Sequence, residues 1–154
     1  MDARERYAVV HQFGRTYRTF LSAFESHVGQ PLPRWRILFA LYEQGAQSQR
    51  RLVDLLHVDA GALTRQIKLL ESDGCIARAT DERDNRVNNV SLTAAGREIV
   101  ETLLPRRTAF LRQAMAQVPD DVLLALRQGL TLLERSMAEM AAPVLTPETP
   151  AASG

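Results

Sequence analysis

The stretch that decides the fold is LVDLLHVDAGALTRQIKLLESDGCIARATDERDNRVNNVSLTAAG, residues Leu52–Gly96. In its first half, apolar residues recur at helical spacing in two short segments that the turn HVD separates. In its second half, CIARAT and VNNVSL have the composition of strands, and DERDNR between them carries five charges. The stretch therefore predicts a helix-turn-helix followed at once by a β-hairpin with a charged tip, which we call the wing.

Apolar periodicity on both sides of this stretch predicts long helices. The predicted helices cover about 4–28, 33–44, 49–56, 60–72, 94–118 and 120–142, with Ser48, Asp59 and Thr93 as N-caps, Gly74 as a left-handed stop and Pro105 as a kink. The fold class is thus mainly α with a small β-hairpin wing. We expect one domain over 1–142, with the winged helix-turn-helix at about 33–93, dimerisation helices at about 4–28 and 94–142, and a disordered tail at 143–154.

The long first and last helices hold more apolar side chain than the small central part can cover. A second copy of the chain would cover it, so a homodimer is expected.

Composition restricts the class of protein. The N-terminus MDARER is charged and leads to no apolar run, which predicts a cytoplasmic protein with no membrane contact. Cys75 is the single cysteine, so no internal disulfide is possible. The three histidines lie in separate elements without paired cysteines or acids, and no glycine-rich phosphate loop is present. We therefore expect no enzyme, no metal and no cofactor.

The second helix of the helix-turn-helix has two different faces. Leu63, Ile67 and Leu70 fall on one side, which predicts burial. The opposite side carries Ala60, Gly61, Thr64, Arg65 and Lys68. A recognition helix enters the major groove tip first, so small residues at the tip allow a close approach to base edges.

Roles on DNA follow from side-chain chemistry. Arg65 is expected to contact guanine, Thr64 a thymine methyl or a phosphate, and Lys68 a phosphate. We also count Ser48 and Arg50, at the start of the preceding helix, among the DNA-binding residues.

The wing supplies further cations. Arg86, near its tip, is expected to enter the adjacent minor groove, where the potential is most negative. Its acidic residues would repel phosphate if they pointed outward, so we assign Asp81 to an ion pair with Arg83 inside the hairpin. Arg83 also counts among the predicted DNA-binding residues.

This sequence resembles the MarR-type winged helix-turn-helix regulators. The resemblance rests on Leu52–Gly96, with its leucine-rich helix, Val-Asp turn, Thr-Arg pair, "D.RD.R" wing and "LT..G" motif. It implies a homodimer that binds double-stranded DNA at a pseudo-palindromic operator and usually represses. It also implies the roles of Thr64, Arg65 and Arg86 on DNA, and the ion pair at the wing. Three features depart from the usual pattern of this family: the Ala60-Gly61-Ala62 tip, His57 and Arg51. They concern which operator sequence is bound.

The resemblance further implies release from DNA by a small aromatic anion held between the dimer helices and the winged domain. The corresponding wall would come from His11, Arg15, Arg18, Trp35 and Phe39, with Arg15 as the first choice for the carboxylate. Benzoate-, cinnamate- and nicotinate-like compounds are all compatible with such a wall. Trp35 and Phe39 are equally compatible with plain core positions.

Two alternatives stay open from the sequence. Cys75 could sense oxidants if its thiolate were accessible and stabilised by cations, although its position favours a small buried residue. A winged-helix dimer could also serve as a protein-interaction module without DNA binding. Salt dependence separates this second alternative from a DNA-binding protein, because phosphate contacts weaken steeply with ionic strength.

Overall fold

The computed structural model of the chain describes residues 1–80 and 88–141. The predicted fold class, mainly α with a small hairpin, is confirmed. The elements are α1 (Ala3–Val28), α2 (Leu32–Gln44), β1 (Gln47–Ser48), α3 (Gln49–Leu56), α4 (Ala60–Ser72), β2 (Ile76–Thr80), β3 (Asn88–Leu92), α5 (Ala94–Met115) and α6 (Asp120–Ala141).

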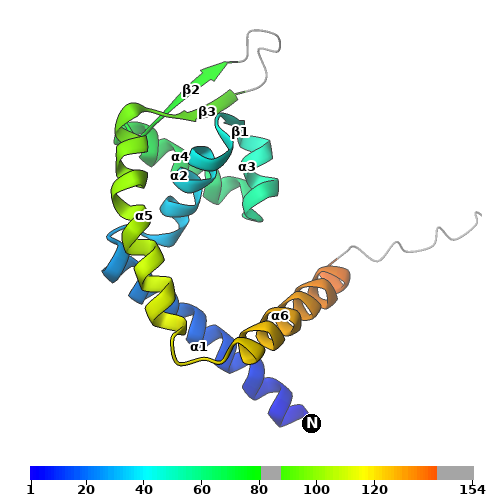
Figure 1. Cartoon of the computed structure of the whole chain (residues 1–154). Helices are drawn as coiled ribbons and strands as arrows, with labels where there is room; N and C mark the ends of the chain where they lie inside the picture. The colour runs from blue at the N-terminus through cyan, green and yellow to red at the C-terminus, as the bar shows by residue number, and fades with distance from the viewer. Residues whose placement is uncertain (81–87, 142–154) are drawn as a thin grey trace, which may run out of the picture. The chain divides into compact units, whose positions relative to one another are not determined.

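The chain divides into two compact units, and the boundary in the sequence falls between Gln113 and Ala114. The first unit holds α1 to α4, the sheet and nearly all of α5. Within it, the hairpin β2–β3 lies beside the group formed by α2, α3 and α4, and α5 begins directly after β3 (Figure 1). The second unit holds α6 and is described by itself.

Side-chain caps explain where the helices of the first unit begin. The Ser48 hydroxyl accepts a hydrogen bond from the Arg51 amide at 3.1 Å, and the Asp59 carboxylate accepts one from the Ala62 amide at 2.8 Å. The Thr93 hydroxyl accepts one from the Gly96 amide at 3.1 Å. All three predicted N-caps are confirmed, since each satisfies an amide that has no partner inside its helix. Gly74, at φ +69°, has the predicted left-handed backbone.

The sheet has one strand that sequence patterning missed. The strand order is β1-β3-β2, and β1 pairs antiparallel with β3 through Gln47 opposite Val90 and Ser48 opposite Asn89. A strand of two residues is too short to show a period of two, so only the tertiary pairing reveals it.

The C-terminal end of α5 also differs from the prediction. The helix ends at Met115, and the Val118 amide donates to the Met115 carbonyl in a turn. Pro119 disfavours helical backbone at the residue before it, which accounts for the earlier end. Pro105 lies inside α5.

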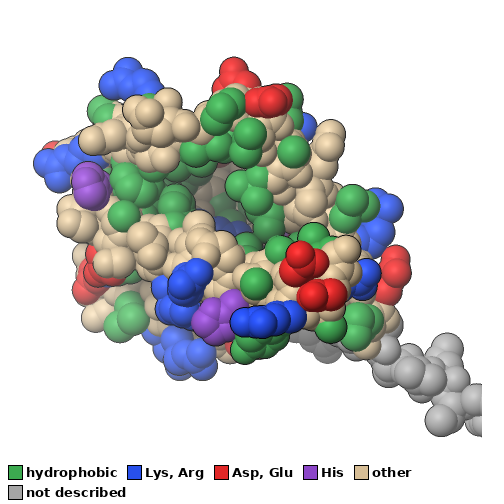
Figure 2. Space-filling model, turned by 90° about the horizontal axis from the view of Figure 1, so that it is seen from below, with side chains coloured by type: hydrophobic (Ala, Val, Ile, Leu, Met, Phe, Trp, Pro, Cys, Tyr) green, Lys and Arg blue, Asp and Glu red, His purple; other side chains and the backbone are tan. Residues whose placement is uncertain are grey.

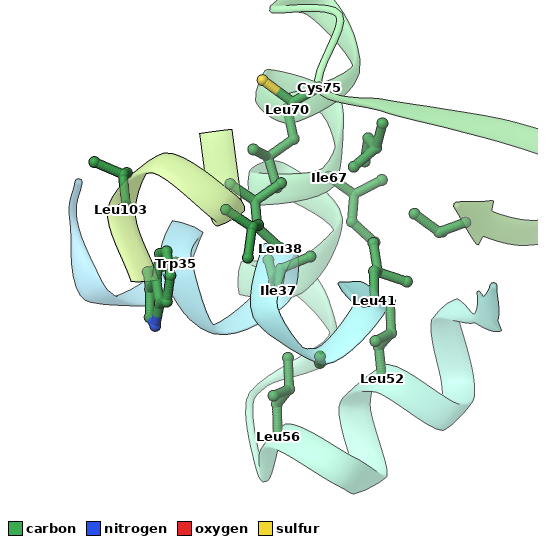
Figure 3. Close-up of a cluster of buried hydrophobic side chains, with 14 of the residues drawn as sticks. Trp35, Ile37, Leu38, Leu41, Leu52, Leu56, Ile67, Leu70, Cys75 and Leu103 are labelled. Atoms are coloured by element: carbon green, nitrogen blue, oxygen red, sulfur yellow. The ribbon is translucent and has the colours of Figure 1, made fainter. Parts of the chain in front are cut away.

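The core of the first unit is apolar and draws on every major element. Leu63, Ile67 and Leu70 of α4 are buried as predicted, and so are Ile37, Leu38 and Leu41 of α2. Figure 3 shows Leu38, Ile67 and Leu70 close together, with Leu52 and Leu56 of α3 below them. Leu55, also on α3, is half-buried and packs against this core.

Aromatic rings join α1 to α5. The rings of Phe24 and Phe110 meet edge to face, with centroids 5.7 Å apart, and Phe20 lies 5.7 Å from Phe110. Phe24 also contacts Trp35 of α2 at 6.5 Å. Such pairs add to the burial of apolar area, so this cluster fixes the C-terminal half of α1 on the winged part.

Many of the remaining apolar side chains of α1 and α6 are exposed in the single chain. On α1, Tyr7 is 67% exposed, Phe13 52% and Tyr17 49%. On α6 the exposed large hydrophobic residues are Val122, Leu124, Leu126, Leu132, Leu133, Met137 and Met140. Figure 2 shows many hydrophobic side chains at the surface, with basic, acidic and histidine side chains among them. Among the described residues, no helix is long and apolar enough to span a membrane.

Candidate nucleic-acid interface

The turn between α3 and α4 sets the angle of the helix-turn-helix. His57 ends α3 in the left-handed region, at φ 49°, and its amide donates to the Val53 carbonyl. Within residues 1–80 and 88–141 it is the one non-glycine residue with a positive φ. This backbone conformation is costly for histidine, so the packing of Leu56 and Leu63 on either side must hold it.

The recognition helix α4 has the two faces that the sequence predicts. Leu63, Ile67 and Leu70 are buried, whereas Arg65 and Lys68 are exposed. Ala60 and Gly61 at its tip are exposed as well, and Thr64 is half-buried. The polar face with its two cations therefore points to solvent, as a surface for DNA requires.

The tip of α4 leaves room for Arg65. A Cβ atom on residue 61 would lie 3.7 Å from Arg65 Nη1 and 3.1 Å from Asp59 Oδ1. The guanidinium group thus lies back along the helix toward its N-terminus. A larger residue than glycine at position 61 would crowd both the Arg65 guanidinium and the Asp59 carboxylate that caps the helix.

The hydroxyl group of Thr64 already has a partner. It donates to the Ala60 carbonyl at 2.8 Å. A phosphate oxygen can only accept hydrogen bonds, so Thr64 has no free hydroxyl proton for it. This favours the thymine methyl over the phosphate among the two contacts predicted for this residue.

Ser48 and Arg50 lie next to the sheet. The Ser48 hydroxyl caps α3, and Arg50 is exposed in the first turn of that helix. Because β1 pairs with β3, the start of α3 is fixed beside the second strand of the wing.

The tip of the wing, with Asp81, Arg83 and Arg86, lies outside the described residues. Its base is fixed by an ion pair that the sequence did not suggest, in which Arg78 of β2 donates to Glu71 in the last turn of α4. The hydrogen bond from Arg78 lowers the pKa of the Glu71 carboxyl below its ordinary value. This pair ties the C-terminal end of the recognition helix to the first wing strand.

A cavity of about 500 Å³, which we call the interhelical pocket, lies between α1, α2, α3 and α5. Trp35 and Phe39 stack in its wall, with centroids 5.6 Å apart and planes at 15°. The guanidinium carbon of Arg107 lies 4.7 Å above the Phe39 ring. The wall is formed by Phe20, Phe24, Leu32, Trp35, Arg36, Phe39, Ala40, Glu43, Gln44, Leu55, Leu56, Arg107 and Leu111.

Only part of the predicted effector wall is assembled in the single chain. Trp35 and Phe39 line the interhelical pocket, whereas His11, Arg15 and Arg18 do not. These three lie exposed on α1, where the Arg15 guanidinium donates to Gln12 and the His11 ring is 5.6 Å from that of Tyr7. The cations of the pocket are instead Arg36 and Arg107, which sequence patterning missed because each is one arginine among many.

A second cavity, of about 330 Å³, lies under the tip of α4, and we call it the tip pocket. Its wall includes Tyr17 of α1, Leu32, Arg36 and Leu56, together with Asp59, Arg65 and Gln66 at the start of the recognition helix. Leu32, Arg36 and Leu56 belong to both cavities.

The single cysteine is part of the core. Cys75 is 2% exposed, and Arg34 Nη2 lies 3.4 Å from its sulfur. Arg34 also forms an ion pair with Asp73. The burial of the thiol agrees with a packing role and leaves little access for an oxidant. Among the described residues, no group of three or more His, Cys, Asp or Glu side chains could hold a metal ion.

A helix-turn-helix with a small-tipped cationic second helix, continued into an antiparallel hairpin, defines a winged helix-turn-helix DNA-binding protein. Residues 31–87 match the family model described as MarR family. This match covers the winged helix-turn-helix part of the chain, and it supports a DNA-binding transcriptional regulator of the MarR type.

Known proteins of this kind align over most of the chain. The uncharacterized HTH-type transcriptional regulator YdgJ of Bacillus subtilis (strain 168) is 29% identical over 137 residues, which cover 84% of this chain and 84% of YdgJ. A mutant MarR from E. coli complexed with operator DNA has a TM-score of 0.77 and 20% identity, over 86% of this chain and 99% of that one. BpsR of Bordetella bronchiseptica has a TM-score of 0.69 and 24% identity, and the match covers 85% of this chain and 98% of the BpsR chain. The likeness to these two structures concerns the fold.

Proposed function

We propose that the protein is a homodimeric repressor that binds a pseudo-palindromic operator and is released from it by a small aromatic anion. The observation that carries the DNA-binding part is the orientation of α4. Its leucine and isoleucine face is buried, while its small tip, Arg65 and Lys68 are open to solvent.

Dimerisation is supported by the exposed apolar side chains of α1 and α6. A soluble monomer rarely leaves so many large apolar side chains in water. Burying about 800 Å² per partner is typical of a stable interface, and long amphipathic helices offer such an area. Two copies would present two recognition helices to successive turns of a duplex, with half-sites about 10 base pairs apart.

On the operator, Arg65 reads a guanine and Thr64 offers its methyl group to a thymine. Lys68, Arg50 and Ser48 contact the phosphate backbone, with Ser48 acting through its position at the start of α3. The wing carries Arg86 into the minor groove, and the pair of Asp81 with Arg83 shapes the hairpin.

The effector occupies the interhelical pocket in this proposal. A volume of about 500 Å³ lies in the range of small-molecule sites, ~300–1,000 Å³. Trp35 and Phe39 cover the plane of an aromatic ring, and Arg36 and Arg107 supply donors for its carboxylate. In the BpsR structure, 6-hydroxynicotinic acid regulates DNA binding on the same fold, which supports a nicotinate-like class.

The α1 cations enter the effector site from the second copy. His11, Arg15 and Arg18 do not line the pocket of their own chain. We assign their contribution to the partner's α1, which would make effector binding depend on the dimer.

The experiment is operator selection followed by effector release. Selection from random duplexes should yield an inverted repeat with half-sites about 10 base pairs apart. Benzoate, cinnamate, nicotinate and 6-hydroxynicotinate are then titrated into the complex, and one or more should release the DNA. Selection of a single half-site would contradict the dimer, and retention of DNA with all four acids would contradict the effector class.

A further inference from the structure

The two cavities of the winged part share a wall. Leu32, Arg36 and Leu56 line both the interhelical pocket and the tip pocket. Two of these residues also form a hydrogen bond, which the Arg36 guanidinium donates to the Leu56 carbonyl. This hydrogen bond therefore belongs to the wall that the interhelical pocket and the tip pocket share.

This hydrogen bond secures the end of α3. Leu56 is the last residue of α3. Its carbonyl is one of the last four of the helix, which accept no hydrogen bond from an amide of the same helix. The next residue, His57, holds a left-handed backbone that is unfavourable for a side chain other than glycine. Asp59, two residues further on, caps α4. The arginine bond thus anchors a strained turn that leads directly to the tip of the recognition helix.

The turn has empty space beside it. The tip pocket of about 330 Å³ is lined by Leu56 and Asp59, which flank the turn, and by Tyr17 and Leu32 of α1 and α2. Packed interiors resist gradual deformation, but an element beside a void can take a second position. Displacement of the turn into this pocket would carry Asp59 and Arg65 with it.

Arg36 is also a ligand-facing cation. Its half-buried side chain lines the interhelical pocket, where a carboxylate would lie within the reach of its guanidinium. A carboxylate carries a full negative charge and can accept two parallel hydrogen bonds from a guanidinium, whereas the Leu56 carbonyl is an uncharged single acceptor. A bound anion therefore competes with the Leu56 carbonyl for the same donor.

We propose that Arg36 is the residue that couples the effector to DNA: an anion in the interhelical pocket takes its guanidinium from the Leu56 carbonyl and releases the turn that positions the tip of α4. This inference rests on the proposed effector pocket. Arg36 is here a positioning residue, because it acts on DNA through the turn.

The test compares Arg36→Gln with Arg107→Gln as a matched control in the same pocket. Trp35 is the only tryptophan of the chain, so its fluorescence reports ligand binding directly. Operator affinity is measured by fluorescence anisotropy without ligand and with saturating cinnamate or nicotinate, whichever quenches Trp35. The ratio of the two affinities is the coupling factor, and allosteric proteins commonly have values of about 5–150.

In the wild type we expect a coupling factor of about 10 or more. Arg36→Gln should bind DNA more weakly without ligand and show a coupling factor below about 2, even when Trp35 reports full occupancy. Arg107→Gln should need about tenfold more ligand and keep the wild-type coupling factor at saturation. A purely structural Arg36 would lower both DNA affinities equally and leave the ratio unchanged.

The outcomes separate the two levels of the proposal. If neither acid quenches Trp35 or releases DNA, the effector pocket is wrong and the coupling route falls with it. If ligand binds and releases DNA from Arg36→Gln as it does from the wild type, the pocket stands and the role of Arg36 is overturned. Should Arg36→Gln melt below the assay temperature, Arg36→Lys replaces it, and this variant must show a coupling factor lower than the wild type.

Discussion

The carbonyl oxygen of Cys75 lies 1.9 Å from the point that a Cβ atom on residue 96 would occupy, so only glycine fits at this position. The contact is part of a junction where the start of α5 meets the end of the recognition helix. Thr93 donates its hydroxyl to the Gly74 carbonyl at 2.6 Å, and its amide donates to the Cys75 carbonyl at 3.1 Å. The "LT..G" motif therefore fixes the wing and α5 against α4.

Replacement of Gly96 by alanine should lower the free energy of unfolding by about 3 kcal/mol, because a backbone carbonyl cannot move aside as a flexible side chain can. Thermal or denaturant unfolding measures this. The control is Gly129→Ala in α6, where the added Cβ meets no atom within 4 Å beyond the local helix backbone, and where alanine should stabilise the helix by about 0.5–1 kcal/mol. Equal free energies of unfolding for Gly96→Ala and Gly129→Ala would contradict the claim that only glycine fits at position 96.

The N-cap of the recognition helix is the next test. Asp59→Ala should cost about 1 kcal/mol of stability and weaken DNA binding, because the Ala62 amide loses its acceptor. Asp59→Asn keeps an acceptor oxygen and should retain both properties nearly in full. If asparagine fails as alanine does, the charge of Asp59 rather than its cap bond is what matters.

Arg65→Ala should reduce operator affinity by roughly 1–3 kcal/mol and relax the preference at one base pair in each half-site. Affinity measurements on a set of single-base operator variants give both quantities. Arg112, exposed on α5, serves as the control, and its replacement by alanine should change affinity by less than about 0.5 kcal/mol. An unchanged base preference in Arg65→Ala would remove this residue from base recognition.

Thr64 can be tested with two variants that dissect its side chain. Thr64→Val keeps a methyl group and loses the hydroxyl, whereas Thr64→Ser does the reverse. Because the hydroxyl is bonded to the Ala60 carbonyl, we expect valine to preserve the preference for thymine and serine to lose it. Comparison of thymine with uracil at that position, which differ only by the methyl group, provides the measurement. The opposite order of the variants would show that the hydroxyl makes the contact.

Local signals explain why the helix-turn-helix was predictable. Ser48, Asp59 and Gly74 act on amides and backbone angles within a few residues, so the bounds of α3 and α4 follow from the sequence. The buried face of α4 follows from its period in the same way. The DNA roles of the exposed face stay predictions, as do those of the wing residues outside the described ranges.

Features that depend on distant parts of the chain were not predictable. The pairing of β1 with β3, and the approach of Arg107 to Phe39, join segments more than 40 residues apart. Arg78 and Glu71 are closer in sequence, yet they meet only because β2 turns back along α4. The sequence singled out Trp35 and Phe39, which line the interhelical pocket, but not Arg36 and Arg107 beside them, because residue type alone does not say which arginine reaches a cavity.

The central claim is that two cationic recognition helices bind the phosphate-lined grooves of one duplex. The most direct test is operator affinity as a function of salt between 50 and 200 mM. With six or more phosphate contacts in the dimer, the logarithm of the affinity should fall linearly with the logarithm of salt, by a factor of about 10³ or more over this range. An affinity that does not change with salt would contradict DNA binding through these helices and would favour a protein-interaction module.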